Sequence, residues 1–366
     1  MAGNKTLLFY INSLNRGGAQ RVLVQLAGRF AAAGWHSVLV TSFVSEDEYP
    51  VPAGVERVSI EQAQLAQSAL RRNVSRIRAL RRLLRRYRPA ALISFMAEPN
   101  FRALLAARGL PVKTIVSVRN DPSREYGGRL SRPVGRWLLP QADGCVFQTH
   151  EAQRWFPERL QKKSAVIMNQ VSEHFFDTPP ASERRDIAAV GRLTAQKNHA
   201  LLISAYAALG PVADRLVIYG EGEERGRLEA LVRAHGLEGR VLLPGQCGQV
   251  ADALRGAKLF VLPSDYEGMP NALLEAMALS LPCISTDCPC GGPAEVLENG
   301  KNGLLVPVGD EAALTAAMRS LLENAAQRET LAANAKKTAE SFRPDVVFRQ
   351  WEDYVNFVIV GKERTK

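Results

Sequence analysis

Short apolar runs alternate with longer amphipathic segments along the whole chain. The runs, rich in Val, Ile, Leu and Phe, predict strands, and the segments between them show the apolar spacing of helices. In the first half the predicted strands are Thr6–Asn12, His36–Phe43, Ala90–Phe95, Val112–Val118, Gly144–Gln148 and Ala165–Met168. In the second half they are Ile187–Val190, Leu216–Tyr219, Val241–Leu243, Leu259–Leu262, Cys283–Thr286 and Gly303–Val306. This alternation predicts an α/β fold with parallel sheets covered by helices.

A polar, proline-containing segment at residues 177–182 separates the two sets of strands. We therefore predict two doubly wound Rossmann-like domains, residues 1–175 and 176–343, that face a central cleft. Ligands of such sheets bind beside the carboxyl ends of the strands, so the loops that follow the strands are expected to carry the chemistry. The amphipathic segment Asp345–Val360 predicts a helix, within residues 344–366, that crosses back to the first domain.

The composition is that of an ordinary folded protein, but the charge is unevenly distributed. At 366 residues and 46% hydrophobic content the chain can bury two cores, and no apolar run reaches the roughly 20 residues of a membrane span. Five cysteines without framework spacing are expected to be free thiols in a reducing cytoplasm. The net charge is +10, and residues 1–170 hold 26 Lys and Arg against 11 Asp and Glu. The first half is therefore expected to meet an anionic partner, either lipid or nucleic acid.

Two carboxylates stand eight residues apart in a predicted strand–loop–helix unit that runs from Phe260 to Met277. Glu267 lies in the loop, Pro270 is predicted at the first helical position, and Glu275 lies inside the helix. Eight helical residues span about 12 Å, whereas a retaining glycosidase holds its two carboxyls about 5 Å apart. The spacing instead suits the two ends of a long ligand whose anionic middle is held by the helix N-terminus. A nucleotide sugar has this shape.

Each half also has a glycine-containing turn between its first strand and the helix that follows. Gly17 and Gly18 open the first of these helices, where small residues let a ligand approach the backbone. A tight turn without a ligand is the alternative. Gly191 begins the corresponding turn of the second half, followed by Arg192 and Lys197. An Arg fork and a Lys point charge suit a diphosphate, although two solvated loop cations would give the same pattern.

One predicted helix carries nine arginines and no acidic residue within residues 71–88. Its apolar stripe, expected to dock on the first sheet, consists of Val74, Ile77, Leu80, Leu84 and Tyr87. Like charges four residues apart repel, and an anionic membrane surface or a pyrophosphate would relieve that repulsion; a solvated face is the alternative. The residues predicted to meet an acceptor or a membrane are Arg71, Arg72, Arg76, Arg78, Arg81, Arg82 and Arg85.

Taken together, these motifs resemble the family-4 retaining glycosyltransferases of GT-B fold, and the resemblance covers essentially the whole chain. It is carried by Gly17-Gly18, by Gly191-Arg192 with Lys197, by Glu267 with Glu275, and by the tail from Gly292 to Pro307. The second half is most similar to members that extend lipid-linked oligosaccharides, often with UDP-sugars. The resemblance implies that no metal or other cofactor is required, and the chain has no Asp-x-Asp sequence of the kind that metal-dependent transferases usually have.

For the donor, the resemblance implies a nucleotide sugar held by a defined set of residues. Arg192 and Lys197 would bind its diphosphate, while Glu267 would contact the sugar hydroxyls and Glu275 the ribose. The backbone around Met269, Pro270, Asn271 and Ala272 would hold sugar and phosphate, and Gly245 with Gln246 would lie near the base. The expected donor-binding set also includes Gly17, Gly18 and Gly191.

For the acceptor, the chain departs from the family pattern. Many members place a His in an acceptor-side loop of the first domain, and the corresponding segment here, Ser117 to Pro122, has none. The expected acceptor-side groups are instead Arg119, Asn120 and Asp121. The alternative for Asp121 is a turn residue before Pro122. The expected catalytic residues are Arg192, Lys197, Glu267, Asn120 and Asp121.

The sequence therefore predicts a metal-independent retaining transferase that moves a hexose or N-acetylhexosamine from a UDP-sugar to a polyprenyl-diphosphate-linked saccharide. It is expected in the cytoplasm, peripheral on the inner face of the cytoplasmic membrane. A nucleotide-sugar epimerase of the same fold is the first alternative. A basic nucleic-acid-binding protein is the second, and it is disfavoured because the chain shows no RNP, KH or zinc-finger pattern.

Overall fold

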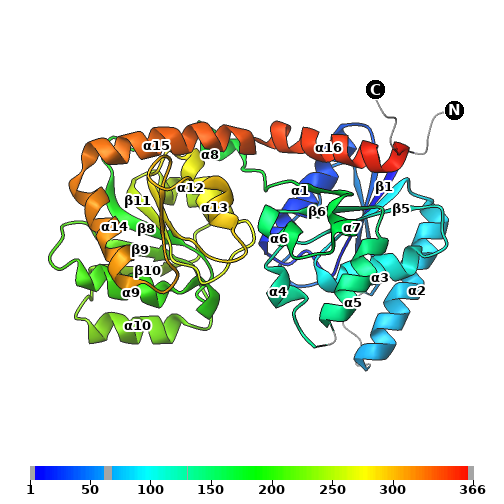
Figure 1. The fold of residues 1–366 in the computed structure, drawn as a ribbon, viewed down its shortest axis with the longest axis horizontal. Helices are drawn as coiled ribbons and strands as arrows, with labels where there is room; N and C mark the ends of the chain where they lie inside the picture. The colour runs from blue at the N-terminus through cyan, green and yellow to red at the C-terminus, as the bar shows by residue number, and fades with distance from the viewer. Residues whose placement is uncertain (1–4, 62–67, 130, 362–366) are drawn as a thin grey trace. The chain divides into compact units, whose positions relative to one another are not determined.

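The computed structural model describes residues 5–61, 68–129 and 131–361 of the chain. The chain forms two compact units, one of Met1–Asn169 with Val347–Lys366 and the other of Gln170–Val346. Each unit is built on one parallel sheet with helices packed on both of its faces (Figure 1). The predicted fold class, two Rossmann-like α/β domains, is confirmed.

The first unit holds a seven-stranded parallel sheet. Its strands are β1 Thr6–Ile11, β2 His36–Thr41, β3 Val55–Ser59, β4 Ala91–Phe95, β5 Lys113–Ser117, β6 Gly144–Phe147 and β7 Ser164–Val166. They lie side by side in the order β3-β2-β1-β4-β5-β6-β7. The helices are α1 Gly18–Ala32, α2 Ala69–Tyr87, α3 Ala97–Ala107, α4 Pro122–Glu125, α5 Ser131–Leu138, α6 His150–Arg154 and α7 Glu158–Gln161. Helix α16, Pro344–Val360, joins this unit from Val347 onward.

Consecutive residues of β1 point to opposite faces of the sheet and belong to two separate cores. Leu7, Phe9 and Ile11 are buried in the core that includes residues of α1 and α16. Leu8 and Tyr10 are buried in the core that includes residues of α2 and α3. Because helices cover both faces, the strand reads as a continuous apolar run rather than as an alternation.

The second unit holds a six-stranded parallel sheet. Its strands are β8 Arg185–Val190, β9 Leu216–Tyr219, β10 Val241–Gly245, β11 Ala257–Leu262, β12 Cys283–Thr286 and β13 Leu304–Val306. Their order is β10-β9-β8-β11-β12-β13. The helices are α8 Glu173–Asp177, α9 His199–Ala208, α10 Arg225–Ala234, α11 Val250–Leu254, α12 Asn271–Ala278, α13 Gly292–Val296, α14 Glu311–Glu323 and α15 Ala325–Ala339.

Each sheet has one point at which the strand order reverses. In the first unit the chain moves from β1 outward to β2 and β3, then returns to β4 on the other side of β1. In the second unit it moves from β8 to β9 and β10, then returns to β11. The chain segments that follow two such strands lead to opposite faces of the sheet, and ligands of doubly wound sheets bind there. The β1/β4 and β8/β11 switch points are therefore where sites are expected.

The structure also corrects the prediction in two places. Strand β3, Val55–Ser59, was not predicted, because it is a half-exposed edge strand with a Glu-Arg pair in the middle of its sequence. Helix α12 ends at Ala278, and Ser280 just after it adopts a left-handed backbone with φ 58°. Pro270 is the N-cap of this helix and not its first residue.

Helix α16 packs on the first unit through aromatic side chains. Trp351 is 1% exposed and stacks on Phe95, with ring centroids 5.8 Å apart. The Tyr354 hydroxyl accepts a hydrogen bond from Cys145 N at 2.8 Å and donates to Lys163 O at 2.6 Å. The last helix of the chain thus helps to close the core of the unit in which the chain begins.

Candidate functional site

The loop after β8 and the loop after β11 meet at the switch point of the second sheet. Lys197 and Glu267 pair there, with Nζ 2.5 Å from Oε1, and the Ser264 hydroxyl donates to the same carboxylate oxygen at 2.7 Å. The side chain of Lys197 is 16% exposed and that of Glu267 is 6% exposed. Charges held away from water in this way interact more strongly than they would in bulk solvent.

Further hydrogen bonds brace these two loops against each other. Asp265 N donates to Gln196 O at 2.9 Å, and Gln196 Nε2 donates to Tyr266 O at 2.9 Å. Asn198 adds a third link, because its amide donates to Asp265 Oδ1 at 2.7 Å. The same Asn198 has a left-handed backbone, φ 44°, and its Oδ1 accepts from Leu201 N at the start of α9. The ion pair is therefore held in a fixed frame.

Two glycines allow backbone segments to pack closely around this frame. A Cβ on Gly220, which has φ 153°, would lie 1.9 Å from the carbonyl oxygen of Gly191. A Cβ on Gly292 would lie 1.6 Å from the carbonyl oxygen of Gly268. Real Cβ atoms do not approach an oxygen so closely, so any other residue at either position would displace the neighbouring loop.

Helix α12 starts directly after the loop that carries Glu267. The predicted donor residues at its start are Met269 and Pro270, both buried, and Asn271 and Ala272, both half-buried. Glu275 lies one turn further along the helix and is 6% exposed. A helix N-terminus attracts anions through its dipole and its first N–H groups, so α12 adds positive potential beside the Lys197 ammonium.

The other predicted donor residues of this unit end neighbouring strands. Gly191 follows β8, and Arg192 beside it is exposed. Gly245 ends β10 with φ 92° and accepts a hydrogen bond from Gly220 N at 2.9 Å, while Gln246 next to it is exposed. All of these residues lie at the carboxyl edge of the second sheet, where an extended ligand could contact them in series.

His199 belongs to this region and was not predicted to matter. It is 2% exposed, and its Nε2 lies 3.5 Å from the ideal Cβ position of Gly191. Burial, together with the nearby Lys197 ammonium, lowers the pKa of His199 to about 4. The ring is therefore neutral at pH 7 and lies against the turn that begins at Gly191. Its position at the first residue of α9, two residues after Lys197, is the only sequence signal that could have identified it.

We expect His199 to make folding stability depend on pH. Its pKa is lower in the folded state than the ordinary value of about 6.5, so its contribution is complete above pH 6.5 and is lost as pH falls toward 4. Between pH 7 and pH 4.5 the wild type should lose about 2 kcal/mol more unfolding free energy than a His199→Gln variant. Urea denaturation across this pH range measures the difference. A His235→Gln variant, which changes an exposed histidine of the same unit, should behave like the wild type, and equal slopes for all three proteins would contradict the account.

Gly17 and Gly18 lie in the first unit, at the end of β1. Gly17 is the N-cap of α1, with φ −157°, and the Gln20 side chain lies 2.5 Å from its ideal Cβ position. Arg21 N donates to Gly17 O at 3.0 Å, which begins the helix. Gly17 and Gly18 thus lie where the loop after β1 enters α1, and contact of these residues with a donor stays a prediction.

Two of the three acceptor-side residues predicted in the first unit, Arg119 and Asp121, have partners within the unit, and contact of these residues with an acceptor stays a prediction. Arg119 is 9% exposed, lies 4.5 Å over the ring of Phe95 and donates to Asn169 Oδ1. Burial lowers the pKa of Arg119 to about 9. Asp121 is 5% exposed and caps α4, because its Oδ1 accepts from Ser123 N at 2.8 Å. The cap agrees with the interpretation of Asp121 as a turn residue, and Asn120, between Arg119 and Asp121, is half-buried.

The arginine-rich helix α2 differs from its prediction at three residues. Arg76 is 6% exposed and pairs with Glu61 at 2.8 Å, because positions 76, 80 and 84 form the buried stripe of the helix. Arg81 donates to the carbonyl oxygens of Ala106 and Arg108. Val74, which was predicted to be buried, is 38% exposed. Neither Arg76 nor Arg81 is a freely presented surface cation.

The remaining arginines of α2 form an exposed basic face. Arg71, Arg78, Arg82 and Arg85 are exposed and line a surface groove of about 730 Å³ that also includes the exposed side chain of Leu70. Arg72 is half-buried. Over the described ranges, we find no helix with the length and apolar character needed to cross a membrane.

Comparison with known proteins places the chain in a family. Residues 16–174 match the family described as Glycosyltransferase Family 4, and residues 170–338 match the family described as Glycosyl transferases group 1. The amylovoran biosynthesis glycosyltransferase AmsD of Erwinia amylovora is 25% identical over 359 residues, which cover 96% of this chain and 99% of that protein.

A second relative and a solved structure agree with this placement. The Campylobacter jejuni enzyme named GalNAc-alpha-(1->4)-GalNAc-alpha-(1->3)-diNAcBac-PP-undecaprenol alpha-1,4-N-acetyl-D-galactosaminyltransferase is 27% identical over 354 residues, 94% of this chain and 96% of that protein. The structure of Anabaena Alr3699/HepE in complex with UDP superposes with a TM-score of 0.82 at 18% identity, and covers 96% of this chain and 99% of that one. The chain is a glycosyltransferase of GT-B fold, whose first half matches Glycosyltransferase Family 4 and whose second half matches Glycosyl transferases group 1.

Proposed function

We propose that this protein transfers a hexose or N-acetylhexosamine from a UDP-sugar to a polyprenyl-diphosphate-linked saccharide, with the anomeric configuration retained. The observation that carries the proposal is the Lys197–Glu267 pair at the β8/β11 switch point, next to the N-terminus of α12. The name of the Campylobacter relative supports a lipid-linked acceptor, and the UDP in the Anabaena structure supports the nucleotide.

In this proposal the cations of the second unit act on the leaving group. The bond between the anomeric carbon and the donor's β-phosphate oxygen breaks, and a new bond forms between that carbon and an acceptor hydroxyl oxygen. The acceptor proton passes to the departing phosphate on the same face. Lys197, Arg192 and the α12 N-terminus would stabilise the charge that develops on the diphosphate, a role that a metal has in other transferases. Glu267 and Glu275 would accept hydrogen bonds from the sugar and the ribose.

Product analysis tests this assignment directly. Purified protein is incubated with UDP-N-acetylgalactosamine and a synthetic polyprenyl-diphosphate saccharide, followed by UDP-galactose and UDP-glucose, and the product is examined by NMR. We expect an extended saccharide with the α configuration of the donor. A product with inverted anomeric configuration would exclude a retaining mechanism. Conversion of the donor sugar in the absence of any acceptor would favour an epimerase instead.

The exposed arginines of α2 suit the other substrate and its membrane. Anionic lipid headgroups and a lipid diphosphate share one chemistry, negatively charged phosphate oxygens, which Arg binds well. The exposed arginines of α2, with no acidic residue between positions 71 and 88, give this face a positive potential. We propose that α2 places the enzyme on the inner face of the cytoplasmic membrane as a peripheral protein.

Charge reversal on α2 should weaken membrane binding. A variant with Glu at positions Arg71, Arg78, Arg82 and Arg85 is expected to bind vesicles with 30% phosphatidylglycerol at least tenfold more weakly than the wild type, because each basic residue near an anionic surface contributes about 1 kcal/mol. Vesicle co-sedimentation at 0.1 M salt measures the change. The matched control reverses four exposed cations elsewhere: Arg233, Lys336, Lys337 and Arg349. Equal binding by both variants would contradict the role of α2.

A further inference from the structure

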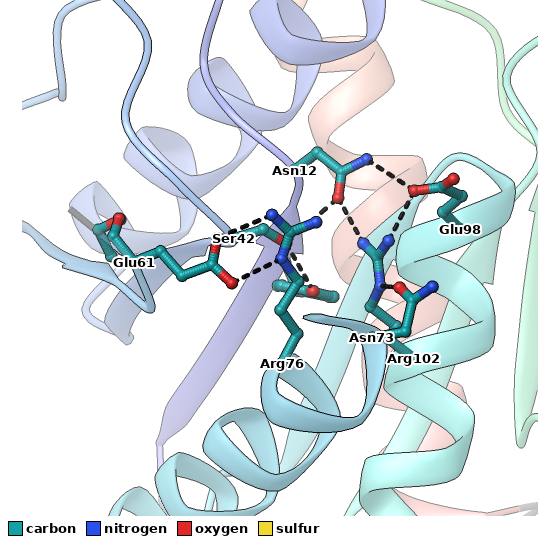
Figure 2. Close-up of polar contacts among 9 residues, drawn as sticks. Asn12, Ser42, Glu61, Asn73, Arg76, Glu98 and Arg102 are labelled. Carbon is teal, nitrogen blue, oxygen red and sulfur yellow. Dashed lines mark hydrogen bonds and ion pairs between the residues drawn. The ribbon is translucent and has the colours of Figure 1, made fainter. Parts of the chain in front are cut away.

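The switch point of the first sheet holds a second, different cluster of polar side chains (Figure 2). Its centre is Arg102 of α3, whose side chain is only 5% exposed. The guanidinium donates to Asn73 Oδ1 of α2 at 2.7 Å, to Asn12 Oδ1 after β1 at 2.5 Å, and to Glu98 Oε2 of α3 at 2.6 Å. One buried side chain thus fixes three polar groups that come from three different elements.

A second guanidinium supports the cluster from the side of β2 and β3. Arg76 forms a two-pronged ion pair with Glu61, at 3.0 and 2.8 Å, and both side chains are under 10% exposed. Ser42 donates to Asn12 Oδ1 at 3.2 Å and contacts the Tyr10 hydroxyl at 2.8 Å. Figure 2 shows Arg76 and Ser42 on one side of Asn12 and Arg102 on the other.

The groups that Arg102 holds are themselves accessible from solvent. The Glu98 side chain is 67% exposed, and Asn12 and Asn73 are half-buried. The amide nitrogen of Asn12 lies 3.5 Å from Glu98 Oε2, which is at the limit of a hydrogen bond. Glu98 is placed by a strained turn, since Met96, the N-cap of α3, has φ 76° without being a glycine. Backbone strain of this kind persists only where surrounding contacts hold the residue in place, and it is common at functional sites.

We infer that Asn12, Asn73 and Glu98 form a subsite for the hydroxyl groups of a neutral saccharide, with Arg102 as the residue that positions them. A hydroxyl both donates and accepts, so it pairs with amide N–H donors and a carboxylate acceptor at once. The inference rests on the proposed function in one respect, which is that the saccharide belongs to the acceptor.

The charge balance distinguishes this subsite from a phosphate site. Each of its two guanidiniums is matched by a carboxylate, Arg76 by Glu61 and Arg102 by Glu98, so no positive charge is in excess. The most exposed group of the cluster is a carboxylate, which repels an anion. At the switch point of the second sheet, by contrast, the exposed Arg192 and a helix N-terminus accompany the ion pair. The two switch points therefore suit different parts of the substrates.

Two isosteric substitutions test the subsite without removing the partners of Arg102. Asn73→Asp and Glu98→Gln each keep an oxygen that can accept from the guanidinium, but change the group offered to the sugar. The matched control is Glu158→Gln, an exposed carboxylate in the first turn of α7 that also forms an i,i+4 ion pair. For each protein we would measure the KM for the lipid-linked acceptor, the KM for UDP-sugar and kcat. Binding of p-nitrophenyl N-acetyl-α-galactosaminide would be followed by saturation-transfer NMR.

Both test variants should raise the acceptor KM at least tenfold with an unchanged donor KM, and should lose the NMR signal of the glycoside. The control and the donor-site variant Lys197→Ala should keep that signal. An unchanged acceptor KM and NMR signal in both test variants would overturn the inference, as would displacement of the glycoside by inorganic pyrophosphate. The NMR arm needs no turnover, so absence of transfer in the wild type would count against the proposed function alone.

Discussion

Replacing Lys197 by alanine is expected to lower kcat/KM for sugar transfer by about 10²- to 10³-fold, the usual effect of removing one group that stabilises a developing anion. Two causes act together. The ammonium that would meet the leaving diphosphate is lost, and the Glu267 carboxylate, 6% exposed, is left beside the Ser264 hydroxyl without its cation. That uncompensated charge would repel the donor. Steady-state kinetics with the donor and the acceptor varied separately measure the loss.

Lys258→Ala is the matched control for this substitution. Lys258 is in the same unit and pairs with Asp214 at 2.6 Å, with side chains 25% and 12% exposed. Its loss should destabilise the unit to a similar degree, because a partly buried carboxylate is again left without its cation. Catalysis should be unaffected. If Lys258→Ala lowered kcat/KM as much as Lys197→Ala, the loss in Lys197→Ala would reflect reduced stability and not a catalytic role of Lys197.

Replacing Gly292 by alanine should have the second largest effect. The added Cβ would lie 1.6 Å from the carbonyl oxygen of Gly268, so the loop that carries Glu267 must move away. Overpacking of this kind costs about 2 kcal/mol of unfolding free energy, and displacement of a substrate-positioning loop by about 1 Å costs about 10²-fold in rate. Thermal denaturation and the transfer assay measure the two losses.

Gly226→Ala serves as the control for the glycine substitution. Gly226 lies in helix α10 of the same unit, and no atom lies within 4 Å of the position that its Cβ would occupy. Alanine should be neutral there or stabilise the helix by up to about 1 kcal/mol. Full activity in Gly292→Ala would show that the contact between Gly292 and Gly268 does not position Glu267.

The strands and the ion pair were accessible to sequence reasoning for different reasons. Buried parallel strands leave continuous apolar runs, and for that reason Leu216–Tyr219 was predicted to the residue. The edge strand Val55–Ser59 lacks such a run because one side of it faces solvent, and it was missed. Lys197 and Glu267 were found through the motifs that surround them. Their direct contact at 2.5 Å follows only from the strand order, which joins two loops 70 residues apart.

The first unit was harder to predict because its charged residues have partners far away in the sequence. In the sequence Arg76 cannot be distinguished from the exposed arginines near it, but in the structure it is buried and paired with Glu61. Arg119 and Asp121 looked available to an acceptor, but one stacks on Phe95 and the other caps a helix. Helical spacing alone cannot distinguish an arginine on a buried stripe from one on a solvated face, because the partner that makes burial tolerable comes from another element.

Acceptor-dependent release of UDP is the measurement that tests the account most directly. Wild type, Lys197→Ala and Lys258→Ala are incubated with a panel of nucleotide sugars, with and without a polyprenyl-diphosphate saccharide, and free nucleoside diphosphate is quantified. We predict UDP release from at least one UDP-sugar that requires the acceptor, persists in Lys258→Ala and falls by about 10²-fold or more in Lys197→Ala. No acceptor-dependent release from any sugar nucleotide, or equal release by the wild type and Lys197→Ala, would contradict it.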